Sequence, residues 1–192
     1  MKIIAFEGGD TTGKATQSNM LVHYLRGQRQ RVHLVEVPVK GNFEYKMIYW
    51  MLQNGTAKKF PKIFQWLQHR NRKKFQDQFL NYLSKVYDFV IFDRWSLSSV
   101  VYGAAMGVDP EFTLPLHRSL ISPDATLVLD GPTRIYFAED EYEKDSKLQA
   151  SVKLLYKAWA LNEERTVIID AAGSPAEVHG RVLDYLREKE II

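Results

Sequence analysis

The sequence contains no cysteine. Neither a disulfide framework nor a thiolate metal site can therefore form, and the chain suits a reducing compartment such as the cytoplasm. Long apolar runs are also lacking. The run near the N-terminus covers about five residues, where a signal peptide needs roughly 7–15, and none approaches the roughly 20 residues of a membrane span. We therefore expect a cytoplasmic protein with no membrane partner.

Bulk composition excludes little else. The chain has 192 residues, of which 45% are hydrophobic and 26% charged, an ordinary globular mixture. This length suits one domain over residues 1–192 with a sizeable core. The net charge of +3 agrees with a phosphorylated ligand, although solubility alone would explain it.

Short apolar runs alternate with longer amphipathic segments along the chain. Buried strands are predicted at residues 2–7, 31–37, 88–93, 125–130 and 166–170. Helices are predicted at residues 13–27, 61–85, 146–163 and 174–190. This alternation predicts an α/β fold of three layers, with a five-stranded parallel sheet covered by helices on both faces. Ligands of such folds bind beyond the carboxyl ends of the strands.

Residues 8–14, GGDTTGK, match the phosphate-binding pattern GxxxxGK. They follow a predicted strand and open a predicted helix, which is the context that a P-loop requires. Glycines let consecutive backbone N–H groups point at phosphate oxygens, and the helix N-terminus adds partial positive charge. Lys14 would place a full charge on the β- and γ-phosphates. A glycine-rich turn with a surface lysine is the alternative, but the context favours a P-loop.

Ala15 stands where a P-loop normally has Ser or Thr, whose hydroxyl binds Mg²⁺. Thr16 is a poor substitute, because the next residue of a helix points about 100° away. Mg²⁺ usually keeps several waters. We therefore expect phosphates, waters and nearby carboxylates to hold the metal.

The third predicted strand, DFVIFD, ends at Asp93 and is followed by Arg94. A carboxylate at this end can reach the metal beside a P-loop, and a guanidinium suits a phosphate. The alternative is that both residues merely cap the next helix. The sequence has no NKxD motif, and Asp93 is not followed by Glu, so a GTPase switch and a water-activating ATPase fit less well. These motifs favour a phosphotransferase.

With the segment FEGGDTTGK at residues 6–14, these motifs resemble the thymidylate kinase family over nearly the full chain. The resemblance implies ATP and Mg²⁺ as cofactors, dTMP as acceptor, and a homodimer. It places Asp10 near the sugar 3′-hydroxyl and the metal. A loop after the last strand, including Ala172, would pack against adenine.

The family also has an aromatic residue followed four positions later by an arginine, which Trp66 and Arg70 match in FQWLQHR. Positions i and i+4 share one helix face. We predict that Trp66 stacks on the base and that Arg70 donates to a base carbonyl. Alone, the pair would be a core tryptophan beside a solvated arginine. A second register uses Arg72, but it places Gln68, which cannot stack, at the aromatic position.

The segment DRWSLSSVVY, residues 93–102, matches a third family motif. In relatives, residues at the positions of Ser98 and Tyr102 line the base and deoxyribose pocket, and the tyrosine leaves no room for a ribose hydroxyl. Gly103 replaces a residue that is usually polar. Pro38 matches a family proline near the acceptor phosphate. The arginine often found beside that proline is absent, and Lys40 would take its place.

The lid predicted at residues about 131–147 lacks the usual arginine, and acid stands at Glu141. Phosphoryl transfer relies on cations that spread developing charge. We expect Lys144 or Lys147 to replace the arginine. Otherwise the enzyme is slow or its acceptor differs.

The resulting predictions name a site. The predicted catalytic residues are Asp10, Lys14, Asp93 and Arg94, and the predicted metal ligands are Asp10 and Asp93. The predicted ATP-binding residues are Gly8, Gly9, Asp10, Thr11, Thr12, Gly13, Lys14, Ala15, Thr16 and Ala172. The predicted acceptor-binding residues are Asp10, Pro38, Lys40, Trp66, Arg70, Arg94, Ser98, Ser99 and Tyr102.

Three readings compete. The favoured one is transfer of a phosphoryl group from ATP to dTMP. Alternatives are a kinase for another deoxynucleotide such as a modified dUMP, and a nucleotide-binding regulator without activity. Besides these three, a nucleic-acid binder is a further alternative, which would use Lys58, Lys59, Lys62, Arg70, Arg72, Lys73 and Lys74, but such a cluster is more often the solvated face of a helix. We expect no nucleic-acid partner.

Overall fold

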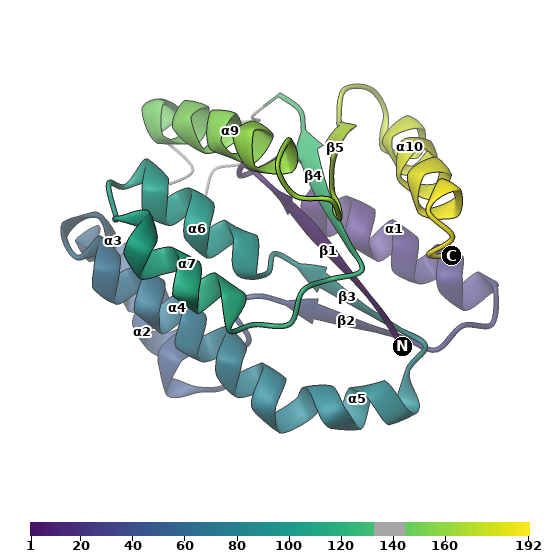
Figure 1. The fold of residues 1–192 in the computed structure, drawn as a ribbon, viewed down its shortest axis with the longest axis horizontal. Helices are drawn as coiled ribbons and strands as arrows, with labels where there is room; N and C mark the ends of the chain where they lie inside the picture. Colours follow the sequence, from purple (N-terminus) through teal and green to yellow (C-terminus); the bar gives the residue numbers. More distant parts are fainter. Residues whose placement is uncertain (133–144) are drawn as a thin grey trace.

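The structure, a computed structural model, describes residues 1–132 and 145–192. Within this part of the chain, five parallel strands form one sheet in the order β2-β3-β1-β4-β5 (Figure 1). The strands are β1 (Lys2–Gly8), β2 (Val32–Glu36), β3 (Phe89–Asp93), β4 (Ala125–Asp130) and β5 (Thr166–Asp170). All five lie within about two residues of their predicted positions.

Helices cover both faces of this sheet (Figure 1). One layer consists of α1 (Lys14–Gly27) and α10 (Pro175–Glu188). The helices of the other side are α2 (Phe43–Gln53), α3 (Thr56–Lys59), α4 (Pro61–Phe75), α5 (Asn81–Val86), α6 (Ser96–Ala105), α7 (Pro110–Arg118) and α9 (Ser146–Ala160). The three-layer α/β arrangement is as the sequence predicted.

The central strand β1 shows why the core forms on both sides. Successive side chains of a strand point to opposite faces. Ile4 and Phe6 join the core under α1 and α10, whereas Ile3 and Ala5 join the core on the opposite face. A strand that is buried on both faces has no side in contact with solvent, which explains why its apolar run is continuous.

The predicted helix over residues 61–85 is continuous but not uniform. A π-helical turn, η1 (Gln76–Leu80), joins α4 to α5. Pro61 lies in the first turn of α4, where a missing backbone N–H costs no hydrogen bond. In residues 1–132 and 145–192, no helix has the length and apolar character needed to cross a membrane.

The carboxyl ends of the three central strands meet at one edge. Phe6 pairs with Asp93 on β3 and with Leu127 on β4, and Gly8 pairs with Leu129. The P-loop after β1 and the Asp93–Arg94 pair after β3 are therefore brought together by register. This is the edge at which parallel α/β folds bind ligands.

Candidate active site

The loop between β1 and α1 has the backbone of a phosphate cradle. Gly8 has φ 135° and Gly13 has φ 96°, values that favour glycine. A Cβ on Gly8 would lie 2.7 Å from the Leu129 carbonyl oxygen, so only glycine fits beside β4. Gly13 is the N-cap of α1 and provides no side-chain cap, which leaves first-turn N–H groups for an anion.

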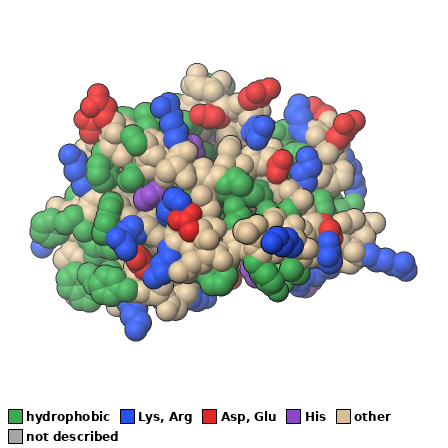
Figure 2. Space-filling model, turned by 60° about the horizontal axis from the view of Figure 1, so that its bottom comes forward, with side chains coloured by type: hydrophobic (Ala, Val, Ile, Leu, Met, Phe, Trp, Pro, Cys, Tyr) green, Lys and Arg blue, Asp and Glu red, His purple; other side chains and the backbone are tan. Residues whose placement is uncertain are grey.

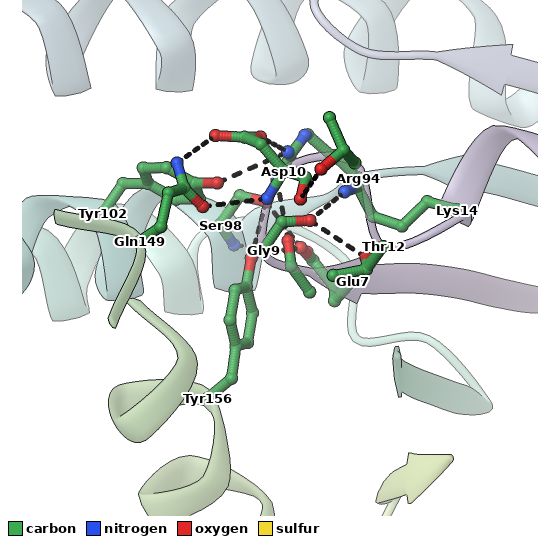
Figure 3. Close-up of polar contacts among 12 residues, drawn as sticks. Glu7, Gly9, Asp10, Thr12, Lys14, Arg94, Ser98, Tyr102, Gln149 and Tyr156 are labelled. Atoms are coloured by element: carbon green, nitrogen blue, oxygen red, sulfur yellow. Dashed lines mark hydrogen bonds and ion pairs between the residues drawn. The ribbon is translucent and has the colours of Figure 1, made fainter. Parts of the chain in front are cut away.

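Lys14 begins α1 and turns back over this loop, where its ammonium donates to the Gly9 carbonyl oxygen (Figure 3). Burial, followed by the nearby Arg94, lowers the pKa of Lys14 to about 8. A buried ammonium whose charge is incompletely balanced is suited to receive an anion. The predicted P-loop therefore has both the backbone and the cation that phosphate binding needs.

Arg94 follows β3 in a left-handed conformation with φ 67°, a strained geometry for a non-glycine residue. This geometry brings its guanidinium to the P-loop, where it donates to the Gly8 carbonyl oxygen at 3.1 Å and pairs with the Asp10 carboxylate (Figure 3). Burial opposes the charge of Arg94, but Tyr102 and Asp10 raise its pKa above the usual range. The guanidinium therefore stays charged next to the phosphate cradle.

Asp10 is held on both carboxylate oxygens. Arg94 takes Oδ1, and the Gln149 amide donates to Oδ2 at 2.6 Å. Burial alone would raise the pKa of Asp10, but Arg94 and Lys14 bring it below its ordinary value. Because both carboxylate oxygens already have partners, Asp10 is less available as a metal ligand than the sequence predicted.

Gln149 is a site residue that the sequence analysis missed. It lies on α9, and its Oε1 also accepts from the Asp10 backbone N–H at 3.0 Å (Figure 3). A single amide thus fixes both the backbone and the side chain of Asp10. The residue is 139 positions away in the chain, and no local pattern marks it, so only the fold reveals this contact.

Glu7 is completely buried under the loop and accepts hydrogen bonds from two elements. The backbone N–H groups of Trp95 and Ser98 donate at 2.8 and 3.2 Å. The hydroxyls of Ser98 and Tyr156 also reach its carboxylate, the second at 2.9 Å (Figure 3). These contacts fasten the start of α6 and the middle of α9 to the P-loop strand. Ser98 is therefore held at the site by Glu7, while it still lines the cavity described below.

Asp93 is the other predicted metal ligand, and its carboxylate forms no hydrogen bond or close ion pair with the other described residues. Burial raises the pKa of Asp93, and Lys14 and Arg94 oppose that effect only in part. No group of three or more His, Asp or Glu side chains able to hold a metal occurs among the described residues. Asp93 beside a phosphate cradle suits a metal whose other ligands are phosphates and waters, which fits Mg²⁺ chemistry.

A cavity of about 380 Å³ opens between the P-loop and the helices α2, α4 and α6. Its walls combine the phosphate end of the site with several amide and aromatic side chains. It is lined by Asp10, Val37, Pro38, Tyr49, Leu52, Gln53, Phe64, Gln65, Gln68, Arg72, Arg94, Ser98, Ser99 and Tyr102. Asp10, Pro38, Arg94, Ser98, Ser99 and Tyr102 were all predicted as acceptor-binding residues from the sequence.

Trp66 and Arg70 are not in this cavity, which corrects their predicted placement. Trp66 is 42% exposed. The Arg70 side chain is 54% exposed, pairs with Glu44 at 3.4 Å, and lies over the Trp66 ring at 4.9 Å. At 100° per residue, Trp66 and Arg70 point about 160° away from Gln68 on the same helix. Trp66 and Arg70 do share one face of α4, as the i, i+4 spacing predicts, but that face is the exposed one and not the cavity face.

Arg72 is the arginine of α4 that lines the cavity, as in the second register. It is 2% exposed, and its Nη1 donates to Gln68 Oε1 at 3.1 Å and to Ser99 Oγ at 3.2 Å. Burial lowers the pKa of Arg72 to about 10. Nη1 also donates to the Gln68 carbonyl oxygen at 2.9 Å, so all three of these bonds involve one nitrogen, and Nη2 is left for an acceptor group on a ligand.

The remaining predicted residues have mixed placements. Lys40 lies outside the cavity and pairs with Glu36 at 3.1 Å in an exposed position, which also corrects the prediction for it. Ala172 lies on the loop before α10, and its backbone N–H donates to Asp170 at 2.9 Å. Lys147 lies exposed at the start of α9. Lys144 and Glu141, with most of the predicted lid, lie outside the described residues.

Known proteins match this arrangement. The family model described as thymidylate kinase matches residues 6–182. The chain belongs to the thymidylate kinase family. The thymidylate kinase of Schizosaccharomyces pombe is 25% identical over 99% of this chain and 93% of its own length. That of Plasmodium falciparum is 27% identical over 95% of this chain and 88% of its own length.

Solved thymidylate kinase structures share the fold. That of Candida albicans has a TM-score of 0.79 at 23% identity and covers 98% of this chain and 92% of its own. That of Ehrlichia chaffeensis has a TM-score of 0.76 at 24% identity and covers 96% and 98%. The family and the P-loop kinase fold predicted from the sequence are thus confirmed.

Proposed function

We propose that this chain transfers the γ-phosphoryl group of ATP to dTMP, giving dTDP and ADP. The observation that carries the proposal is the junction of a P-loop with a base-sized cavity, joined through Arg94 and Asp10. Membership of the thymidylate kinase family supports ATP-dependent phosphorylation of dTMP and does not favour the regulator alternative.

The cations at the junction would stabilise the transferring group. Lys14 would contact the β- and γ-phosphates, and Arg94 would lie between donor and acceptor phosphates. No general base is needed, because the acceptor phosphate is already nucleophilic. Gln149 would act as a positioning residue, since it holds Asp10 on both its backbone and its side chain.

ATP and Mg²⁺ fit the donor side. Mg²⁺ supplies charge neutralisation on the β- and γ-phosphates when it is bound. We assign its protein contact to Asp93 rather than to Asp10, whose oxygens are held by Arg94 and Gln149. The loop carrying Ala172 would contact adenine, since Gln17 of α1 donates to the Pro175 carbonyl oxygen at 2.9 Å and ties that loop to the P-loop helix.

The acceptor side is reassigned by the cavity. Arg72 replaces Arg70 as the arginine that would donate to a base carbonyl. Gln68 cannot stack on a base, but Phe64 supplies an aromatic ring in the cavity wall. Tyr102 would lie against the deoxyribose, because its hydroxyl is 3.4 Å from Arg94 at the phosphate end. Its ring would leave no room for a 2′-hydroxyl. Lys147 remains the described candidate for the missing lid arginine.

A homodimer fits the surface. Exposed hydrophobic side chains occur on α2, α4 and the segment between them, including Trp50, Phe60, Ile63 and Trp66. Figure 2 shows hydrophobic side chains gathered at the left end of the molecule, where Figure 1 places α2, α3 and α4. A second copy of the chain would cover Trp66, which explains its exposure. Sedimentation of Trp66→Glu tests this: a monomer is expected, and an unchanged dimer would refute this face.

The proposal is tested by ADP release with purified protein. The wild type should release ADP from ATP only when a deoxynucleoside monophosphate is present, and Lys14→Ala should lower that rate by at least about a hundredfold. Circular dichroism and thermal unfolding should show a folded variant, because Lys14 contacts a loop carbonyl rather than the core. Near-normal turnover by Lys14→Ala would refute the assignment.

A further inference from the structure

Asn71 of α4 directs its side-chain amide at the segment between β2 and α2. The residue is completely buried. Its Oδ1 accepts from the Val39 backbone N–H at 2.7 Å, and its Nδ2 donates to the Val39 carbonyl oxygen at 2.9 Å. An amide that pairs with both backbone groups of one residue fits in only one orientation. Asn71 therefore holds Val39 much as a neighbouring strand would.

Nδ2 of Asn71 has a second acceptor in the same segment, the Asn42 Oδ1 at 3.0 Å. Asn42 is the N-cap of α2, and the same oxygen accepts from the Tyr45 backbone N–H at 2.8 Å. Such a cap satisfies a first-turn N–H group of its helix. One amide thus holds both the segment before α2 and the first turn of α2.

The elements that Asn71 holds form one wall of the cavity. Val37 and Pro38 directly precede Val39 and line the cavity. Three side chains of α2 line it as well, namely Tyr49, Leu52 and Gln53. A further wall is α4, which packs against α2 (Figure 1). Asn71 itself does not line the cavity. It joins two of the cavity walls from behind.

Two ion pairs also connect α2 to α4, but they lie closer to solvent. Glu44 of α2 lies 3.4 Å from Arg70 and 3.7 Å from Lys74, and both of these cations are substantially exposed. Water and salt screen such pairs. The hydrogen bonds of Asn71 are protected because its side chain is buried, and their loss would leave backbone groups of Val39 without partners. Asn71 is therefore the stronger connection between the two walls.

We propose that Asn71 is a positioning residue, which holds residues 37–42 and the start of α2 against α4 and so sets the width of the cavity. The inference rests on the proposed function, in which a nucleoside monophosphate occupies this cavity. A wall that moves outward loses contacts to the bound nucleotide and no longer orients it for transfer. The donor side should be unaffected, because Asn71 bonds to Val39 and Asn42 and neither belongs to the P-loop.

Calorimetry with dTMP and with ADP tests the inference. Asn71→Ala removes all three hydrogen bonds, so it should raise the Kd for dTMP at least about tenfold and change the Kd for ADP less than about twofold. Leu25→Ala is the matched control for lost stability, because Leu25 is a core residue near the end of α1. It should leave both Kd values unchanged. An unchanged Kd for dTMP in folded Asn71→Ala, or an equal rise in both Kd values, would refute the inference.

A pair of substitutions at Asn42 adds a conservative rescue. Asn42→Ala removes one bond to Asn71 and the cap of α2, and should raise the Kd for dTMP about threefold. Asn42→Asp keeps an oxygen that can accept from both Asn71 and the Tyr45 N–H, and should bind dTMP as the wild type does. If thermal unfolding shows that Asn71→Ala fails to fold, this pair decides. Equal Kd values for the two Asn42 variants would then overturn the inference.

A phosphorylation assay separates this inference from the proposed function. A wild type that binds dTMP but transfers no phosphoryl group to it would refute the function alone, because calorimetry still measures the effect of Asn71 on dTMP binding. An active wild type whose Kd for dTMP is unchanged in folded Asn71→Ala would refute the role of Asn71 alone. A wild type that binds no deoxynucleoside monophosphate would refute both.

Discussion

Arg72 and Arg70 offer a matched pair of substitutions on one helix. Arg72 is buried in the cavity wall, whereas the Arg70 side chain is 54% exposed on the opposite side of α4. Replacing each with methionine keeps the length of the side chain and removes the guanidinium. We expect Arg72→Met to impair dTMP phosphorylation and Arg70→Met to leave it nearly unchanged.

The magnitude for Arg72 follows from its burial. A charged hydrogen bond to a base carbonyl is worth about 1.5–3 kcal/mol, so kcat/KM for dTMP should fall about 10–150-fold. Stability should respond differently. Burial lowers the pKa of Arg72 to about 10, which corresponds to about 3 kcal/mol against its charged form. Removing that charge offsets the lost bonds to Gln68 and Ser99, so we expect the free energy of unfolding to change by less than about 1 kcal/mol.

Arg70 should behave as a surface residue. It pairs with Glu44 at 3.4 Å, and Lys74 lies 3.7 Å from the same carboxylate, so Glu44 keeps a partner in the variant. Exposed pairs contribute about 0–1 kcal/mol. Steady-state kcat/KM and urea unfolding of both variants would check the prediction. A larger loss of kcat/KM in Arg70→Met than in Arg72→Met would refute the assignment of the cavity face.

Three further predictions follow from individual contacts. The binding of ADP should weaken as pH rises above about 8, because burial lowers the pKa of Lys14 to about 8 and phosphates bind its charged form; calorimetry from pH 7 to about 9.5 should show this loss in the wild type but not in Lys14→Arg. Glu7→Leu should lower the free energy of unfolding by about 2–4 kcal/mol, since the N–H groups of Trp95 and Ser98 would then be buried without their acceptor; unchanged urea unfolding would contradict the role of that network. Ala15→Ser should keep turnover and reach half-maximal rate at lower Mg²⁺, whereas strong inactivation would mean that the loop packs around the alanine methyl.

Much of the fold could be read from the sequence, for a physical reason. Strands buried on both faces need continuous apolar runs, and DFVIFD and the residues around Ile4 have them. The P-loop could also be read, because its glycines, its lysine and its strand–helix setting are all local. Asp93 and Arg94 followed from the same logic, since the end of a parallel strand places them at the ligand edge.

The residues of the acceptor pocket could be predicted less completely than those of the P-loop. Pairs of residues at i and i+4 occur in several registers on α4. The register that begins with the aromatic Trp66 was predicted to bind the base, but it lies on the exposed face. The buried residues Phe64, Leu67, Asn71 and Phe75 recur at helical spacing and mark the inward face. That pattern would have favoured Gln68 and Arg72. Gln149 and the pairing of Glu7 with Tyr156 depend on contacts across more than a hundred residues, which no local spacing encodes.

In the reaction that we propose, the P-loop and the cavity together phosphorylate a thymine nucleotide. A competition experiment tests it most directly: wild-type protein receives limiting ATP with equal concentrations of dTMP, dUMP, dCMP and dGMP, and the diphosphate products are separated and quantified. We expect dTDP to be the main product, dUDP to follow, and dCDP and dGDP to be far behind. A product mixture dominated by dCDP or dGDP would show that the cavity does not select thymine.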